Sequence, residues 1–163
     1  MRFGSWLVFL SAAIAMVLLA TSHASAQKRQ PPYYESIKPS RARMRTGPGR
    51  AYPATWLYIR AGLPVKVIAV YQDWKKIEDP DGTQGWFLDT LLSTRRTAMV
   101  SGTTTDMREK RDYDSRLLWR AAPGVIGRIS DCSGGWCWFD VGGKAGYVEE
   151  THLWGVDPGE QLN

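Results

Sequence analysis

Short stretches of strand-like apolar residues, each ended by turn residues, recur along most of the chain. One covers residues 54–59, and the next, residues 65–71, is rich in β-branched side chains. After a third stretch at residues 74–78, Pro80 and Gly82 indicate a hairpin, because proline presets φ and glycine accepts a positive φ. No segment after residue 26 keeps a long apolar period of 3.6 residues. The pattern therefore predicts short β-strands rather than helices.

This strand pattern occurs twice. The octapeptide at residues 85–92, Gly-Trp-Phe-Leu-Asp-Thr-Leu-Leu, returns 61 residues later as Gly-Tyr-Val-Glu-Glu-Thr-His-Leu at residues 146–153. Other matches pair Trp74 with Trp136, Met44-Arg45 with Met107-Arg108, and Arg60-Ala61 with Arg120-Ala121. A period near 60 residues is too long for a solenoid repeat and is about the size of a minimal self-folding domain. We therefore expect two tandem domains.

The N-terminal pattern is different. Arg2 precedes an almost uninterrupted apolar run at residues 7–20, and small residues follow at 24–26. This arrangement is typical of a secretory signal cleaved before Gln27, and the run is short for a membrane span, although a retained anchor is the alternative. We expect export to the periplasm and no integral membrane segment in the mature protein.

Composition agrees with a small exported β-protein. Removal of residues 1–26 leaves 137 residues with 20 basic and 16 acidic side chains, a net charge of about +4. This charge is spread along the chain and does not indicate nucleic acid as a partner. The expected organisation is a signal peptide at 1–26, a linker at 27–38, domains at 39–97 and 98–157, and a C-terminal tail at 158–163.

Three ordered motifs of the first copy resemble the bacterial SH3 domain family. They are Arg-Met-Arg-Thr-Gly-Pro-Gly at residues 43–49, Trp-Lys-Lys-Ile at 74–77 and Gly-Trp at 85–86. The second copy departs from the family pattern, since residues 106–109 lack Gly-Pro and Tyr147 replaces a tryptophan. Its ending resembles the double-SH3 periplasmic proteins of alphaproteobacteria. The resemblance implies an all-β fold of two tandem small SH3-like β-barrels, but no particular ligand.

The sequence Asp-Cys-Ser-Gly at residues 131–134 is similar to the nucleophile motif of NlpC/P60 cell-wall peptidases. In those enzymes the cysteine begins a helix and a later strand supplies a histidine base. Here Gly-Trp-Cys-Trp at 135–138 predicts a turn and a strand, only 31 residues follow Cys132, and His152 is the only histidine after residue 26. We therefore expect no enzyme activity, and a degenerate cysteine peptidase stays as an alternative.

Cys132 and Cys137 bracket four residues that suit a hairpin connection. Facing residues of antiparallel strands lie about 4.5–5.5 Å apart at Cα, which a disulfide can span. An oxidising compartment favours this bond over free thiols. Two cysteines and one distant histidine are too few ligands for zinc. We expect a disulfide worth about 2 kcal/mol, no metal and no cofactor.

Arginines alternate with apolar residues at positions 41–45, so a strand there would place Arg41, Arg43 and Arg45 on one face. Arg50 extends this stripe. It is either a cationic rim that binds carboxylates or phosphates, or a solvated strand face.

The chain holds more aromatic rings than two small barrels can bury, so some must be exposed. Rings at matched positions, such as Trp74 and Trp136, are expected at the core or its edge, and Trp154 is a candidate for the interface between the barrels. Trp138 is expected on the face opposite Cys137 and Phe139. The candidate ligand-binding residues are Arg43, Arg45, Tyr52, Trp56, Tyr58, Tyr113, Trp119 and Trp138.

Together these features predict a non-catalytic binding module of the periplasm or cell envelope. Peptidoglycan is the leading ligand, and an adaptor that binds another envelope protein is the alternative. Nucleic acid is not expected, because export separates the chain from it.

Overall fold

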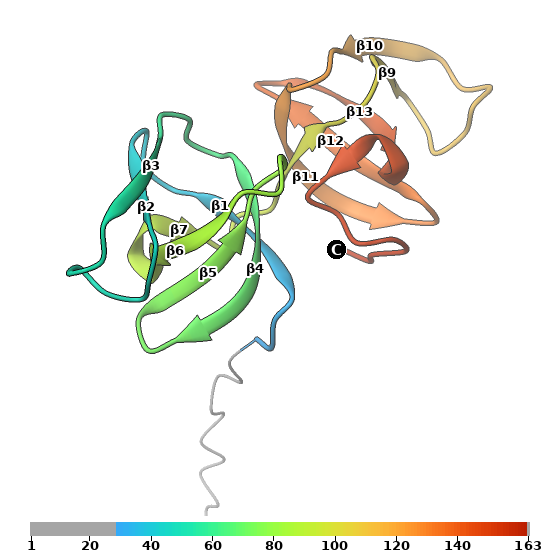
Figure 1. Ribbon diagram of the computed structural model, residues 1–163. Coiled ribbons are helices and arrows are strands. Elements are labelled where there is room, and N and C mark those ends of the chain that lie inside the picture. The colour runs from blue at the N-terminus through green and yellow to red at the C-terminus, as the bar shows by residue number, and fades with distance from the viewer. Residues whose placement is uncertain (1–28, 163) are drawn as a thin grey trace, which may run out of the picture.

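The computed structural model describes residues 29–162 and shows two lobes, each built on one seven-stranded sheet (Figure 1). The signal peptide expected at 1–26 lies outside these residues. The first lobe contains β1 (Tyr33–Ile37), β2 (Ala42–Arg45), β3 (Ala54–Tyr58), β4 (Pro64–Tyr71), β5 (Trp74–Glu78), β6 (Gln84–Leu88), the 3₁₀ helix η1 (Asp89–Leu91) and β7 (Leu92–Ser93). The second contains β8 (Thr97–Val100), β9 (Thr105–Arg108), β10 (Leu117–Ala121), β11 (Ile126–Ser133), β12 (Trp136–Val141), β13 (Lys144–Glu149), η2 (Glu150–His152) and β14 (Leu153–Trp154).

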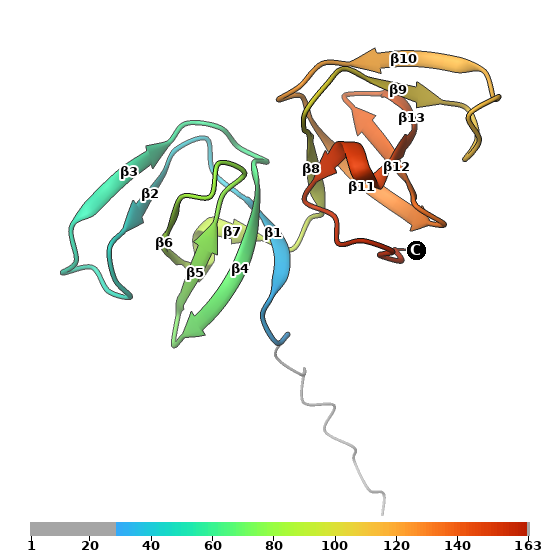
Figure 2. The same ribbon diagram turned by 45° about the vertical axis from the view of Figure 1, so that its right-hand side comes forward.

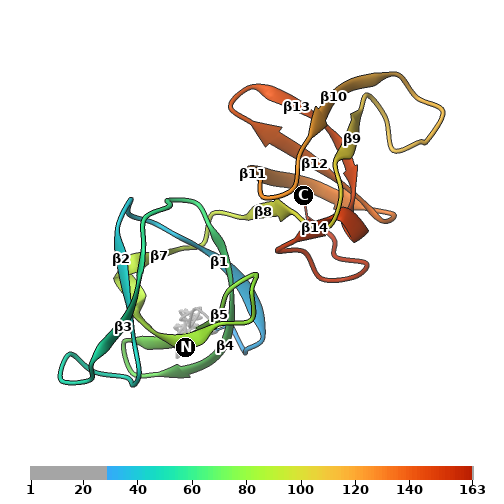
Figure 3. The same cartoon turned by 45° about the horizontal axis from the view of Figure 1, so that its top comes forward.

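The two sheets have the same topology. Their strand orders are β3-β2-β6-β5-β4-β1-β7 and β10-β9-β13-β12-β11-β8-β14, so each strand of the second lobe has a counterpart seven strands earlier. Every paired strand runs antiparallel to its neighbour, and the strands of the first lobe lie around a ring (Figure 3). The expected all-β fold of two tandem small barrels is confirmed. Among residues 29–162 no helix is long and apolar enough to cross a membrane.

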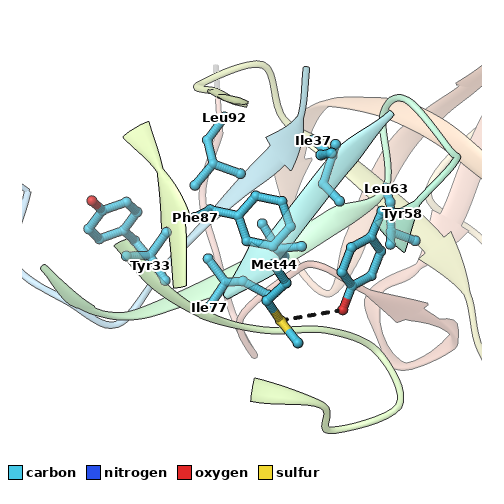
Figure 4. Packing of buried hydrophobic residues seen from close by; sticks show 11 residues of the cluster. Tyr33, Ile37, Met44, Tyr58, Leu63, Ile77, Phe87 and Leu92 are labelled. Atoms are coloured by element: carbon cyan, nitrogen blue, oxygen red, sulfur yellow. Dashed lines mark hydrogen bonds between the residues drawn. The ribbon is translucent and has the colours of Figure 1, made fainter. Parts of the chain in front are cut away.

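Alternation along the strands builds one core in each barrel. In β4 the side chains of Val65 and Val67 are fully buried, and they enclose Phe87 of β6 together with Ile77 of β5. Phe87 lies at the centre of this cluster (Figure 4). Phe139 of β12 is likewise fully buried in the second barrel. Burial of each such ring supplies about 1.5–3 kcal/mol, which makes these central positions the main source of barrel stability.

The expected linker at 27–38 is wrong for residues 33–37, which form β1. This strand is buried at all five positions, because β4 pairs with one of its edges and β7 with the other. The Glu35 carboxylate inside it accepts hydrogen bonds from Lys75 Nζ at 2.7 and 2.9 Å. A buried charge is tolerated only with such a partner. Since that partner is 40 residues away, the local sequence does not reveal the strand.

The register of the edge strands corrects one repeat match. Met44 lies opposite Trp56, and Met107 lies opposite Trp119. Residues 120–121 are therefore equivalent to residues 57–58 and not to Arg60-Ala61. Both strand pairs contain a β-bulge, which shifts the alignment in a way that residue matching along one chain does not detect.

Direct contacts join the barrels. Thr97 Oγ1 at the start of β8 donates a hydrogen bond of 2.8 Å to the Gly62 carbonyl, and an Arg60 guanidinium nitrogen donates one of 2.7 Å to the Gly124 carbonyl. Tyr34 of β1 and Trp154 of β14 meet edge to face, with ring centroids 5.3 Å apart. Trp154 thus covers the interface, as the sequence suggested. The separation of the two lobes is clearest in Figure 2.

The expected disulfide joins Cys132 of β11 to Cys137 of β12. Both sulfur-bearing residues are buried in the second core, and β11 has an irregular register between Ser130 and Ser133. The bond therefore closes the hairpin beside its bulge, where strand pairing is interrupted.

Replacing both cysteines by alanine should lower the free energy of unfolding by about 2 kcal/mol, since the bond closes a loop of sequence separation 5 and short loops restrict little unfolded-chain entropy. Urea unfolding of the protein spanning residues 27–163, followed by tryptophan fluorescence, measures this loss. Reductant should destabilise the natural protein and leave the double variant unchanged. An equal response of both proteins would contradict the expectation.

The C-terminal residues pack on the second barrel. The Leu162 N–H donates to the Cys132 carbonyl at 3.0 Å, and its side chain contacts the second core. Glu160 forms an ion pair with Arg96, and both side chains are largely buried. Burial by itself raises the pKa of Glu160, but hydrogen bonds from Arg96 and from the Asp157 N–H outweigh it and hold that pKa below its usual value.

A Glu160→Gln variant should be less stable than the natural protein by about 1–2 kcal/mol at pH 7, because Arg96 loses its charged partner. A lowered folded pKa means that the carboxylate stabilises the fold above its unfolded value near pH 4.5. That contribution disappears as the pH falls through the folded pKa. Thermal unfolding of both proteins between about pH 3 and 7 should therefore converge at the acidic end. A difference that is independent of pH would rule out the ion pair as its cause.

Candidate functional site

Each barrel has a surface groove at the same place in its fold. In the first barrel it lies where the end of β2, the β2–β3 loop, the start of β5 and η1 meet, and its volume is about 150 Å³. This first groove is lined by Arg43, Arg45, Arg50, Trp74, Leu88 and Leu91.

The second groove has the same position between β9, the β9–β10 loop, the start of β12 and η2, with a volume of about 280 Å³. Its lining residues are Thr104, Thr105, Asp106, Arg108, Tyr113, Trp136, Glu149 and His152. Arg108 and Trp136 are the repeat counterparts of Arg45 and Trp74. The duplication therefore kept the place of the groove and its tryptophan.

One arginine in each barrel holds the loop beside its groove. Arg45 Nη1 donates to the carbonyls of Arg50 at 3.1 Å and Tyr52 at 2.6 Å. Its counterpart Arg108 donates through Nη1 to the Ser115 carbonyl at 2.8 Å. Because these nitrogens are engaged by loop carbonyls, Arg45 acts chiefly as a positioning residue. Its contact with Arg50 places that side chain at the groove.

The charges of the two grooves differ. No carboxylate lines the first groove, and within residues 29–162 neither Arg43 nor Arg50 forms an ion pair. Both side chains are exposed. The first groove therefore offers two free guanidinium groups beside a half-buried indole, which suits a ligand that carries a carboxylate and an apolar part.

Charges in the second groove are largely compensated within it. Arg108 forms an ion pair with Asp106 at 2.7 Å, and Glu149 accepts a hydrogen bond from the Tyr113 hydroxyl. His152 Nε2 lies 3.6 Å from Glu149 Oε2. The second groove thus lacks the free positive charge of the first.

The arginine stripe follows the predicted alternation. Ala42 and Met44 are buried in the first core, whereas Arg41 and Arg43 are exposed on the opposite face of β2. Tyr52 of the β2–β3 loop is half-exposed and covers Gly47, where an added Cβ would lie 2.4 Å from its ring. Any side chain at position 47 would displace the ring and change the loop next to the first groove.

Tyr58 was expected at a ligand-binding surface, and the structure contradicts this. Its side chain is only 7% exposed, and its hydroxyl donates to Asp79 Oδ2 at 2.7 Å and points toward the Met44 sulfur (Figure 4). Burial, together with the Asp79 carboxylate, raises the pKa of Tyr58. The cause is register: Tyr58 lies opposite the buried Ala42 and shares its inward face.

Trp56 and Trp119 stay exposed, with 56% and 45% of their surfaces open. The sequence placed them outside the repeated positions, but they are equivalent in register, each opposite a buried methionine. Lys144 Nζ lies 5.2 Å from the Trp119 ring centroid. These two rings lie on the edge strands β3 and β10 rather than in the grooves.

The remaining predicted aromatics lie in the second barrel. Tyr113 is 62% exposed and meets Trp136 edge to face at 5.0 Å in the second groove. Trp138 is partly exposed and contacts Tyr147 at 5.0 Å. It points away from the fully buried Phe139, as strand alternation predicted.

The predicted residues thus do not form one site. Sequence reasoning assigned Trp74 and Trp136 to the core edge and did not propose Glu149 or His152. The repeat itself held a usable signal, since matched tryptophans beside matched arginines recur at both grooves. Among residues 29–162, no three metal-binding side chains converge.

Comparisons with known proteins identify one family. A family model described as the bacterial SH3 domain matches residues 38–94 and again residues 102–155. No curated protein matches the chain.

Solved structures with similarity include NlpC2 from Trichomonas vaginalis, at 12% identity and a TM-score of 0.35, covering 79% of this chain and 51% of that one. NlpC1 from the same organism has 11% identity and a TM-score of 0.34, with coverage of 77% and 46%. An NlpC/P60 family protein from Bacillus cereus has 12% identity and a TM-score of 0.34, with coverage of 74% and 55%. The chain spans about half the length of these proteins.

Proposed function

The chain belongs to the bacterial SH3 domain family, and from this premise we propose that it is a non-catalytic module of the cell envelope that binds peptidoglycan. Domains of this family serve as cell-wall binding modules, which supports the proposal. The observation that carries it is the first groove, where Arg43 and Arg50 present free guanidinium groups beside Trp74.

The chemistry of the first groove fits a peptide-bearing glycan. Peptidoglycan stem peptides carry carboxylates, which guanidinium groups bind through paired, charge-assisted hydrogen bonds. The indole of Trp74 offers a flat apolar surface for the uncharged part of the ligand. Because the Arg45 side chain fixes the carbonyl of Arg50, the loop presents this cation without first having to order.

A binding role without catalysis agrees with the state of Cys132. A cysteine peptidase needs a thiolate, which is activated at a helix N-terminus or by a histidine. Cys132 lies inside strand β11, and its buried sulfur is bonded to that of Cys137. The motif at residues 131–134 therefore supports a structural role.

The periplasm is the compartment that we propose for this module. The apolar run at residues 7–20 and the small residues before Gln27 support export. The Cys132–Cys137 bond is of the kind that persists in an oxidising compartment.

Co-sedimentation with purified peptidoglycan sacculi tests this function. The protein spanning residues 27–163 should pellet with sacculi at low salt, and an Arg43→Ala, Arg50→Ala variant should pellet several-fold less, because the carboxylates lose both guanidinium partners. Arg116→Ala is the matched control, since Arg116 is an exposed cation on the other barrel.

The control should retain most of its binding. If the natural protein stays in the supernatant at low salt, the proposed function is wrong. If Arg116→Ala loses as much binding as the double variant, net charge and not the first groove is responsible.

An adaptor role toward another envelope protein is the second candidate. It is favoured by the exposed apolar side chains of β3, which lie outside both grooves.

A further inference from the structure

Strand β3 is an unprotected sheet edge. It ends the strand order of the first sheet, so only β2 pairs with it and its other side is free. Residues 54–58 contain no charged side chain, and the exposed fractions of Trp56, Leu57 and Ile59 are 56%, 41% and 73%. Natural sheets normally protect such an edge with charges, proline or a covering segment. An apolar edge without this protection marks an interaction surface.

The equivalent strand of the second barrel is protected, which provides an internal comparison. Arg120 lies within β10 and donates to Asp106 at 3.1 Å. Lys144 lies over the ring of Trp119, the counterpart of Trp56. The bare edge is therefore a property of the first barrel and does not follow from the shared fold.

A groove of about 300 Å³ runs beside β3. Residues 56–60 form one side, and the β5–β6 turn, residues 79–83, contributes the other. Leu63 and Met99 also line it, and Met99 belongs to β8 of the second barrel. The tandem arrangement thus contributes an apolar contact that one barrel alone would lack.

The turn gives this groove an acidic side. Asp79 is already engaged, since its carboxylate accepts hydrogen bonds from the Tyr58 hydroxyl and from the Asp81 and Thr83 N–H groups. Asp81 is exposed, and within residues 29–162 it forms no ion pair. The one cation of the lining, Arg60, donates to the Gly124 carbonyl. A ligand therefore meets a free carboxylate at the end of an apolar strand.

We propose that β3 binds an extended segment of a partner protein, which adds a strand to the open edge of the first sheet. Main-chain hydrogen bonds along β3 supply affinity, and alternate side chains supply specificity. Apolar side chains of the segment cover Trp56 and Leu57, and a basic side chain reaches Asp81. This site is separate from the first groove and does not depend on peptidoglycan binding.

Charge complementarity selects a partner segment over a second copy of this chain. Residues 54–58 are uncharged, so pairing of β3 with its own copy would supply no cation for Asp81 from the paired strands. A segment that alternates apolar and basic residues satisfies both the strand and the carboxylate.

A synthetic peptide of about eight residues that alternates valine and lysine is a suitable probe, with a valine–threonine peptide as the neutral comparison. Titration calorimetry with the protein spanning residues 27–163 should show tighter binding of the lysine peptide. Trp56→Ala and Asp81→Asn should each raise its Kd about tenfold. Trp119→Ala, at the same register of β10, is the matched control and should leave the Kd unchanged.

The proposal fails if neither peptide binds at about 1 mM, if both bind equally, or if Trp119→Ala weakens binding as much as Trp56→Ala. Sedimentation of the protein without peptide tests the other occupant: a dimer that Trp56→Ala dissociates would assign the edge to a second copy and overturn the proposal. Circular dichroism checks that the variants fold. Sacculus binding by Trp56→Ala should be normal, so failure here and failure of peptidoglycan binding are separate results.

Discussion

The hydrogen bonds from one arginine to the carbonyls of its own loop hold the ligand-facing side of each barrel in place. Alternation in β2 sends Met44 into the core, so the next residue, Arg45, emerges at the base of the β2–β3 loop and reaches its carbonyls. Arg108 does the same one repeat later. Without this tether, the loop that carries Arg50 and Tyr52 would have to order on binding, at a cost in affinity. Groove shape therefore rests on a residue that sequence reasoning took for a ligand contact.

Duplication preserved this geometry while the surface charge diverged. Both barrels keep the strand order, the central phenylalanine and the tryptophan of the groove. The first groove retains free guanidinium groups, whereas ion pairs and hydrogen bonds compensate most charges of the second. The two edge strands differ in the same way. Core packing constrains volume and register tightly, and exposed positions can change charge at little cost in stability.

Much of the candidate site was predictable, and the errors have identifiable causes. The exposure of Arg43 and the orientation of Trp138 follow from alternation, which needs only neighbouring residues. The burial of Tyr58 depends on its pairing with Ala42 across a bulged strand pair, and strand β1 depends on partners far along the chain. The equivalence of Trp56 and Trp119 was missed for the same reason, because bulges shift the register relative to the sequence match.

The sequence by itself determined the all-β class, the two copies, the disulfide hairpin and the stripe of arginines. Each of these depends on patterns that are local or that repeat along the chain, such as period-two alternation, turn residues and short cysteine spacing. Tertiary structure alone decided which arginine holds a loop, which tryptophans are equivalent, and that β3 lies bare beside an acidic turn. These features depend on strand order and register, which join residues distant in sequence through non-local hydrogen bonds and packing.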